Sequence, residues 1–177
     1  TELGGSIDPH PFVDVDGTAY LLWKADGNAV GLASTLFAQT LGPDGLALTG
    51  QAAALLSSGA PWEEPLIENP AMVGTGGSYA LLYSGGWWES RGYAVGYATC
   101  GSPLGPCTKV TVDAPLVATG PGEDGPGGAC VVSGPAHEQW LAYHAWTGGV
   151  VGYDQGGARS LHFAALTWQD GRPVVTR

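Results

Sequence analysis

Positive charge is scarce in this sequence. Only six of its 177 residues are Lys or Arg, against 16 Asp and Glu, which gives a net charge of -10 and a pI near 4.5. So acidic a surface repels nucleic acids and anionic membranes, and both are excluded as partners. A neutral ligand is the more natural expectation.

Long apolar runs are missing as well. No segment reaches the roughly 20 apolar residues that a membrane helix needs, and Gly or Pro interrupts the longest apolar stretches. No charged start followed by an apolar run precedes Thr1, so a signal peptide is absent, removed or lost with upstream sequence. Localisation, secreted or cytoplasmic, is left open by the sequence.

Cysteine is rare, with three residues. Cys100 and Cys107 enclose the turn GSPLGP and either close a small disulfide loop or remain two buried free thiols, whereas Cys130 lies in the apolar segment GACVV. Their spacing fits no zinc pattern, because no second cysteine pair or histidine cluster lies nearby. We expect neither a metal nor a cofactor.

Glycine and proline, by contrast, are abundant, at 30 and 13 residues. Turns are therefore frequent, long amphipathic helices are hard to place, and the composition predicts an all-β protein. Three segments repeat one pattern of apolar strand, Gly-containing turn and aromatic-rich strand. They begin at Ile7, Ile67 and Gly127, and both steps are 60 residues.

Each of these hairpins is followed by two more short apolar segments. Third strands are expected at 29–41, 93–100 and 160–168, and fourth strands at 45–50, 108–112 and 172–176. Four antiparallel strands per repeat are typical of a β-propeller blade, and the blades would span about 1–60, 61–120 and 121–177 of one partial domain. A β-sandwich is the alternative, but the regular spacing favours blades.

Three blades do not close a ring, because propellers typically have about four to eight. An incomplete ring would expose apolar surface and strand edges on its two outer sheets. We therefore expect either further blades from a larger propeller or association of this chain with copies of itself.

Two carboxylates stand out in the first strands of the repeats. In a propeller these strands line the central channel, where equivalent positions converge on one ligand. Asp8 and Glu68 take matching places, each next to or close before a proline that keeps the backbone extended. Taken singly, Asp8 would be a turn residue and Glu68 a solvated strand end, but the matching places favour a functional pair.

Four segments carry a more specific signal: SIDPHPFVDVDGTAYLLWKADGN, PLIENPAMVGTGGSYALLYSGG, YAVGYATCGSPLGPC and GGARSLHFAALTWQDGRP. In this order they resemble glycoside hydrolase family 43, whose members are five-bladed propellers that cleave arabinofuranosides and xylosides. The resemblance implies that Glu68 is the general acid that protonates the leaving oxygen. It also implies that Asp8 raises the pKa of that acid and holds it in place.

The resemblance further implies inversion of the anomeric centre, with a third carboxylate as the base that activates water. In the family the base belongs to the first blade, two blades before the segment around Asp8, so this chain matches the last three of five blades. Asp14, Asp16 and Asp26 are carboxylates at hand, but hairpin-turn chemistry explains them. The general base is therefore expected outside this chain.

Side chains for binding sugar are also suggested. Trp87 and Trp88 share the Gly-rich loop YSGGWWESRGY, and one of them, Trp87 by preference, is expected to stack on a sugar ring while the other joins the core. Arg159 resembles the arginine that family members point at sugar hydroxyls, and the alternative is an ion pair bracing Asp8 or Glu68. His144 is interpreted as a satisfied core histidine before a ligand-binding one. Many family members have a histidine after the last-blade GPGG, where Ala129 stands here, so an axial metal is not expected.

These features predict an inverting glycoside hydrolase, of the α-L-arabinofuranosidase or β-D-xylosidase type, that acts on plant cell-wall pentose glycosides. The alternative is a non-catalytic carbohydrate-binding propeller fragment. A structural or protein-interaction fragment is the third possibility, in which the carboxylates are incidental.

Overall fold

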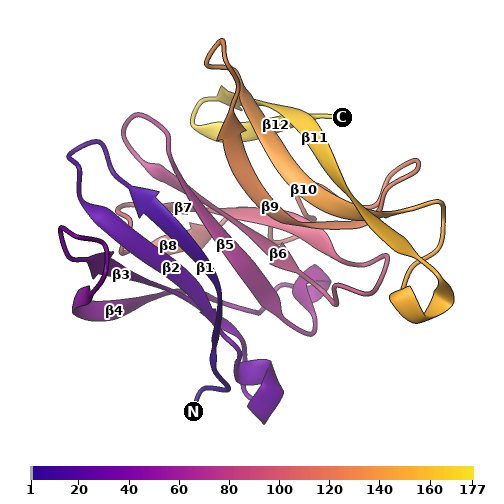
Figure 1. Cartoon of the computed structure of the whole chain (residues 1–177), viewed down its shortest axis with the longest axis horizontal. Helices are drawn as coiled ribbons and strands as arrows, with labels where there is room; N and C mark the ends of the chain where they lie inside the picture. Colours follow the sequence, from indigo (N-terminus) through magenta and orange to yellow (C-terminus); the bar gives the residue numbers. More distant parts are fainter. Residues whose placement is uncertain (1) are drawn as a thin grey trace.

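Short apolar segments between Gly- and Pro-rich turns favour strands, and strands dominate the computed structural model, which describes residues 2–177. Within that range three four-stranded antiparallel sheets follow one another along the chain (Figure 1). The first contains β1 (Ser6–Val13), β2 (Ala19–Ala25), β3 (Thr35–Leu41) and β4 (Leu48–Ser57). The second contains β5 (Ile67–Gly74), β6 (Tyr79–Gly85), β7 (Ala94–Cys100) and β8 (Cys107–Lys109). The third contains β9 (Asp124–Ser133), β10 (Gln139–Thr147), β11 (Ala158–Gln169) and β12 (Arg172–Thr176). The all-β prediction is confirmed.

Some predicted strand limits in the first repeat are wrong. Its third strand starts at Thr35 rather than Ala29, because Gly27–Val30 coil into a 3-10 turn (η1) that Gly31 ends at φ 77°. Its fourth strand covers Leu48–Ser57 rather than 45–50, because residues 42–47 form the turn before it. Two further 3-10 turns, η2 (Pro61–Glu63) and η3 (Tyr153–Gln155), lie outside the strands. Within residues 2–177, no helix has the length and apolar character to cross a membrane.

The fourth strand of the second repeat is also shorter than expected. β8 ends at Lys109, whereas the prediction ran to Val112. The backbone N–H groups of Val110 and Thr111 both donate to the carbonyl of Tyr97, so the regular pairing with β7 stops there.

Side-chain alternation along β6 explains why the second sheet is buried on both faces. Leu81 and Tyr83 pack toward the first sheet, and Leu82, pointing the other way, packs toward the third. The outer faces of the first and third sheets lack such cover in the described part of the chain. Trp23 stacks on Phe37 outside the first sheet, with ring centroids 5.7 Å apart, and Phe163 lies exposed on the third.

The first strand of each sheet carries the same irregularity. Asp8, Asn69 and Gly128 adopt left-handed backbone conformations, with φ of 55°, 53° and 62°. At each of these points two residues of the first strand lie opposite one residue of the second, which is a β-bulge. The three first strands are neighbours, because β5 contacts both β1 and β9.

This register corrects the expected equivalence of Asp8 and Glu68. Asp8 corresponds to Asn69, and Glu68 corresponds to Ile7, because Ile7 pairs with Lys24 just as Glu68 pairs with Ser84. Matching the two Asx-Pro pairs, Asp8-Pro9 and Asn69-Pro70, would have found this from the sequence. The two carboxylates are therefore near each other without being symmetric.

Of the two predicted arrangements of Cys100 and Cys107, the structure has the disulfide. Cys100 and Cys107 form a disulfide that joins the end of β7 to the start of β8. Cys130, on β9, is half-buried and free.

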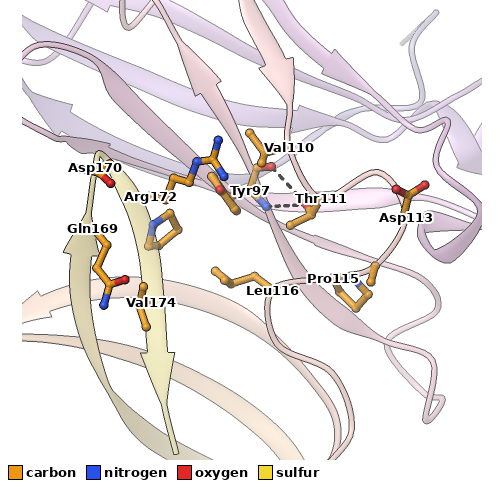
Figure 2. Close-up of a pocket in the computed structure, with 12 residues that line it drawn as sticks. Tyr97, Val110, Thr111, Asp113, Pro115, Leu116, Gln169, Asp170, Arg172 and Val174 are labelled. Carbon is orange, nitrogen blue, oxygen red and sulfur yellow. Dashed lines mark hydrogen bonds between the residues drawn. The ribbon is translucent and has the colours of Figure 1, made fainter.

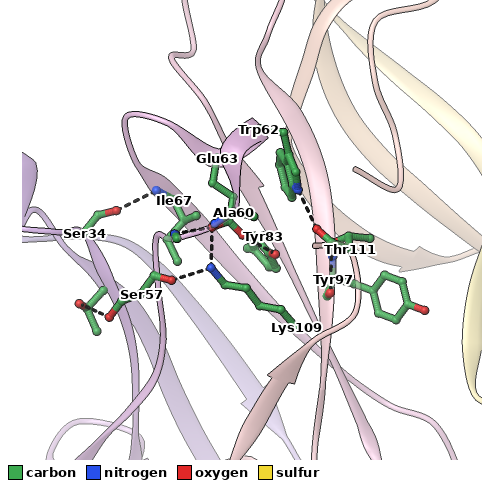
Figure 3. Close-up of polar contacts among 12 residues, drawn as sticks. Ser34, Ser57, Ala60, Trp62, Glu63, Ile67, Tyr83, Tyr97, Lys109 and Thr111 are labelled. Atoms are coloured by element: carbon green, nitrogen blue, oxygen red, sulfur yellow. Dashed lines mark hydrogen bonds and ion pairs between the residues drawn. The ribbon is translucent and has the colours of Figure 1, made fainter. Parts of the chain in front are cut away.

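A buried ion pair holds the first and second sheets together (Figure 3). Glu63, fully buried in η2, accepts hydrogen bonds from Lys109 of β8, from the hydroxyl of Tyr83 at 2.8 Å and from two backbone N–H groups of the preceding turn. Lys109 also donates to the carbonyl of Ser57, the last residue of β4, at 2.6 Å. The pair thus fixes the chain that leads into β5, five residues before Glu68.

We expect Glu63→Gln to lower the free energy of unfolding by about 3 kcal/mol, because the ammonium of Lys109 then loses its charged partner inside the fold. Urea unfolding followed by circular dichroism measures this. Glu64→Gln, at the exposed neighbouring carboxylate, is the matched control and should change stability by less than about 0.5 kcal/mol. Equal midpoints for the two variants would contradict the role given to Glu63.

Candidate active site

The bulges of β1 and β5 bring the two predicted carboxylates to one place. Oδ2 of Asp8 accepts a hydrogen bond from the backbone N–H of Asn69, at 3.0 Å, so Asp8 lies against the residue that follows Glu68. The side-chain amide of Asn69 donates in turn to the carbonyl of Ala129 on β9, at 3.1 Å. One set of hydrogen bonds therefore ties the first strands of all three sheets together at the level of the carboxylates.

Both carboxylate oxygens of Glu68 are bound by donors. Nζ of Lys24, from β2, lies 3.1 Å from Oε2, and the hydroxyl of Tyr93, just before β7, donates to Oε1 at 2.7 Å. The Lys24 ammonium also pairs with Oδ1 of Asp26, at 2.8 Å. The side chain of Glu68 is 14% exposed and that of Lys24 only 2%, so solvent screens these contacts weakly.

Two groups beside Glu68, Asp8 and Tyr93, have raised pKa values. Burial, and then the negative charge of Glu68, raise the pKa of Asp8 above its ordinary 3.8. The same two causes hold the pKa of Tyr93 well above 10, so its hydroxyl keeps its proton and remains a hydrogen-bond donor. The charge of Glu68 therefore acts on both Asp8 and Tyr93.

A chain of contacts leads from Glu68 to Arg159. The ring of Tyr93 stacks on His144, with centroids 5.8 Å apart, and Nε2 of His144 lies 3.4 Å from Nη1 of Arg159. Burial, and then the charge of Arg159, lower the pKa of His144 to about 4, so this imidazole is neutral near pH 7. Its Nδ1 is buried and has no hydrogen-bond partner in the part of the chain described, which contradicts its interpretation as a satisfied core histidine.

Arg159 is held by aromatic rings. Its Cζ lies 4.8 Å from the ring centre of Trp88, 5.5 Å from that of Trp146 and 5.2 Å from that of Tyr153, whose hydroxyl also accepts from Nε at 2.8 Å. Across residues 2–177 no carboxylate pairs with Arg159. The expected alternative, an ion pair with Asp8 or Glu68, is therefore wrong, and Lys24 is the cation that binds Glu68.

The two tryptophans of the loop after β6 differ in exposure. Trp87 is 46% exposed and tilts against Trp88 at a centroid distance of 6.0 Å, whereas Trp88 stacks on Trp146. The loop is fastened to the third sheet, because Nε1 of Trp146 donates to the carbonyl of Trp88 at 3.0 Å and Arg91 pairs with Asp124 at 2.6 Å. Trp87 is thus presented on a supported loop.

Sequence reasoning missed several site residues. Asp26 does begin the connection of the β2–β3 hairpin, but turn chemistry does not explain it, because its carboxylate binds Lys24. Asp14 and Asp16 do lie in the β1–β2 turn, where each accepts a hydrogen bond from a nearby backbone N–H. Lys24 was detectable as a lone cation on the inward face of an apolar strand, but its partner on another sheet was not.

A cavity of about 870 Å³ lies elsewhere, between the segment after β8 and the β11–β12 turn (Figure 2). Tyr97, Leu116 and Arg172 line it, and its two carboxylates, Asp113 and Asp170, lie at opposite ends of the view. None of the predicted site residues reaches it. We therefore place the candidate active site at β1 and β5.

The model of the family described as "Glycosyl hydrolases family 43" matches residues 1–173. No curated protein sequence matches the chain.

Solved structures give the same picture. A thermostable family-43 glycoside hydrolase is 28% identical with a TM-score of 0.87, and the match covers 97% of this chain and 57% of that one. An endo-1,4-beta-xylanase from Bacteroides thetaiotaomicron is 25% identical with a TM-score of 0.82, over 97% of this chain and 58% of that one. An alpha-L-arabinofuranosidase from Lactobacillus brevis shares the fold, at 21% identity and a TM-score of 0.79, over 97% and 55%. This chain thus spans little more than half the length of these proteins.

Asp8→Asn is expected to stabilise the chain at pH 7. Because folding raises the pKa of Asp8, the folded state binds its proton more tightly, and stability falls as the pH rises through and above about 3.8. Asparagine removes that cost and tolerates the left-handed backbone, so we expect a gain of about 0.5 kcal/mol at pH 7 that disappears near pH 3. Thermal unfolding between pH 3 and pH 7 measures it.

Asp16→Asn is the matched control of opposite sign. Hydrogen bonds from Thr18 lower the pKa of Asp16, so its charge stabilises the fold and the variant should lose stability at pH 7. A lower melting temperature for Asp8→Asn than for the parent chain at pH 7 would show that the ionised Asp8 does not destabilise the fold.

Proposed function

The chain belongs to glycosyl hydrolase family 43, and from that premise we propose that it carries two of the three carboxylates of an inverting glycosidase. The proposed substrates are α-L-arabinofuranosides or β-D-xylosides of plant cell walls. The observation that carries the proposal is the placement of Glu68, hydrogen-bonded on both oxygens, beside the half-buried carboxylate of Asp8.

In this proposal Glu68 is the general acid and Asp8 modulates its pKa. The charge of Asp8 disfavours a second negative charge beside it, which helps the acid to hold its proton before reaction. A hydroxyl group both donates and accepts, so Tyr93 can stay bound to Oε1 whether Glu68 is protonated or not. Glu68 then gives its proton to the leaving oxygen as the glycosidic C–O bond breaks.

Inversion requires a base on the opposite face of the sugar, at a distance that leaves room for water. The family resemblance assigns that base to a blade preceding the segment around Asp8, and we place it outside this chain. The three sheets would be the last three of five propeller blades. The apolar outer faces, with Trp23 and Phe37 on one and Phe163 on the other, suit further blades at either side.

In this proposal Trp87 and Arg159 bind the sugar. Trp87 presents an exposed indole on which the C–H face of a pentose can stack, and Arg159 has a guanidinium edge for sugar hydroxyls. The endo-1,4-beta-xylanase, which is 25% identical to this chain, supports a pentose as the substrate unit.

We expect Glu68→Gln to reduce kcat/KM on an unactivated arabino- or xylo-oligosaccharide by about 100-fold or more, because the leaving oxygen then departs unprotonated. The loss on a 4-nitrophenyl pentoside should be smaller, since nitrophenolate leaves without a proton. Hydrolysis is measured for this chain and for a form extended upstream. Glu89→Gln, which removes a carboxylate within the tryptophan loop but keeps an acceptor for the backbone N–H of Tyr153, is the control expected to keep full activity.

Equal losses on both substrates would contradict the role of Glu68 as acid. Binding of pentosides by calorimetry without turnover in either form would instead favour the non-catalytic carbohydrate-binding alternative.

We expect Trp87→Ala to weaken pentoside binding about tenfold, because the exposed ring supplies stacking area. Isothermal calorimetry measures the dissociation constant. Phe163→Ala, which removes an even more exposed ring from the outer face of the third sheet, should leave binding unchanged. Equal weakening by the two substitutions would contradict a specific platform at Trp87.

A further inference from the structure

Lys24 is a buried cation whose placement the fold does not require. It is 1% exposed, although lysine is rarely so buried unless it is paired, and its ammonium lies between Glu68 and Asp26. The register-equivalent residues of the other two sheets are Ser84 and His144. Neither equivalent is a cation near pH 7, so the same strand position is built with neutral side chains in the second and third sheets.

The charges that face Glu68 come from several elements. Asp8 approaches from β1, Lys24 from β2 and Asp26 from the segment after β2, while the neutral hydroxyl of Tyr93 approaches from the start of β7. Behind Tyr93 lie the neutral ring of His144 and then the charge of Arg159. Three carboxylates therefore meet at one weakly solvated place, and Lys24 is the cation in direct contact with two of them.

A general acid has to satisfy two opposing demands. Before reaction it has to hold a proton, and a neighbouring anion such as Asp8 favours that. During reaction the proton moves to the leaving oxygen, the glycosidic bond breaks and Glu68 is left as a carboxylate, while the base takes a proton from the attacking water. A cation in contact with Glu68 stabilises the carboxylate that this step creates.

We propose that Lys24 is a positioning residue for the general acid: anchored by Asp26, its ammonium holds Oε2 of Glu68 and balances the charge left when the proton is transferred. This inference rests on the proposed function. Tyr93 donates a hydrogen bond to the other oxygen. The two contacts together restrain rotation of the Glu68 carboxyl group away from the leaving group.

The first test follows the titration of Glu68 directly. In carboxyl-13C NMR, with the Glu68 signal assigned from Glu68→Gln, we expect the titration midpoint to move up by about 1 pH unit or more in Lys24→Met. Lys24→Gln removes the same charge but keeps a polar side chain, and it serves if Lys24→Met does not fold. Lys24→Arg keeps the charge and should restore most of the original midpoint.

Lys109→Met is the matched control, because Lys109 is the other lysine of the chain and also forms a buried ion pair. It should lower stability without moving the Glu68 midpoint. An unchanged midpoint in folded Lys24→Met or Lys24→Gln, or an equal change in Lys109→Met, would overturn the proposal.

The second test is kinetic and uses an unactivated pentose oligosaccharide. In Lys24→Gln the alkaline limb of kcat/KM should move to higher pH, in step with the NMR midpoint, and kcat should fall about tenfold with KM nearly unchanged. A rise in KM at constant kcat would overturn the positioning role. If the chain hydrolyses no pentoside in any form, the proposed function fails, and the NMR titration still decides whether Lys24 controls the charge of Glu68.

Discussion

The left-handed residue in the first strand of each sheet is the constraint on which the candidate site depends. At Asp8, Asn69 and Gly128 the strand inserts one extra residue, bends, and frees backbone groups from regular pairing. Side chains of neighbouring strands accept hydrogen bonds from the freed backbone groups. The N–H of Asn69 donates to Asp8, and the N–H of Gly128 donates to Oγ of Ser84 at 2.9 Å. The bulges therefore join the three sheets at one level and gather the polar side chains there.

The three sheets repeat one backbone pattern, but the side chains at equivalent positions differ in their contacts. Lys24, Ser84 and His144 share one register, yet each does something different. Lys24 reaches a carboxylate on the next sheet, the small Ser84 allows β9 to approach closely, and His144 carries the stacked ring of Tyr93. Gly127 and Gly128 complete this arrangement, because a Cβ on either would collide with Tyr93 or His144.

This combination explains what the sequence could predict. Period-2 alternation and turn residues are local, so the all-β fold, the repeat and most strands were predictable. The limits of β3 were misplaced because Gly27–Val30 coils instead of extending, and those of β4 because residues 42–47 form a turn. Asp8 and Glu68 were selected through an equivalence that the bulge register overturns. Lys24 and Tyr93 were missed because their contacts cross between sheets, and no local pattern encodes which side chains meet there.

The chain has few cations, and two of them, Lys24 and Arg159, lie in contrasting surroundings. Lys24 is surrounded by carboxylates, so its donors are engaged and its effect is on the charge of its neighbours. Arg159 is surrounded by aromatic rings, which attract a cation through their faces and leave the edge of the guanidinium less engaged. Two cations in one acidic chain thus have opposite surroundings. In the proposed function, Lys24, held by carboxylates, tunes a reacting group, whereas Arg159, held by rings, offers donors to a neutral, hydroxyl-rich ligand, which is the class that the overall charge already favoured.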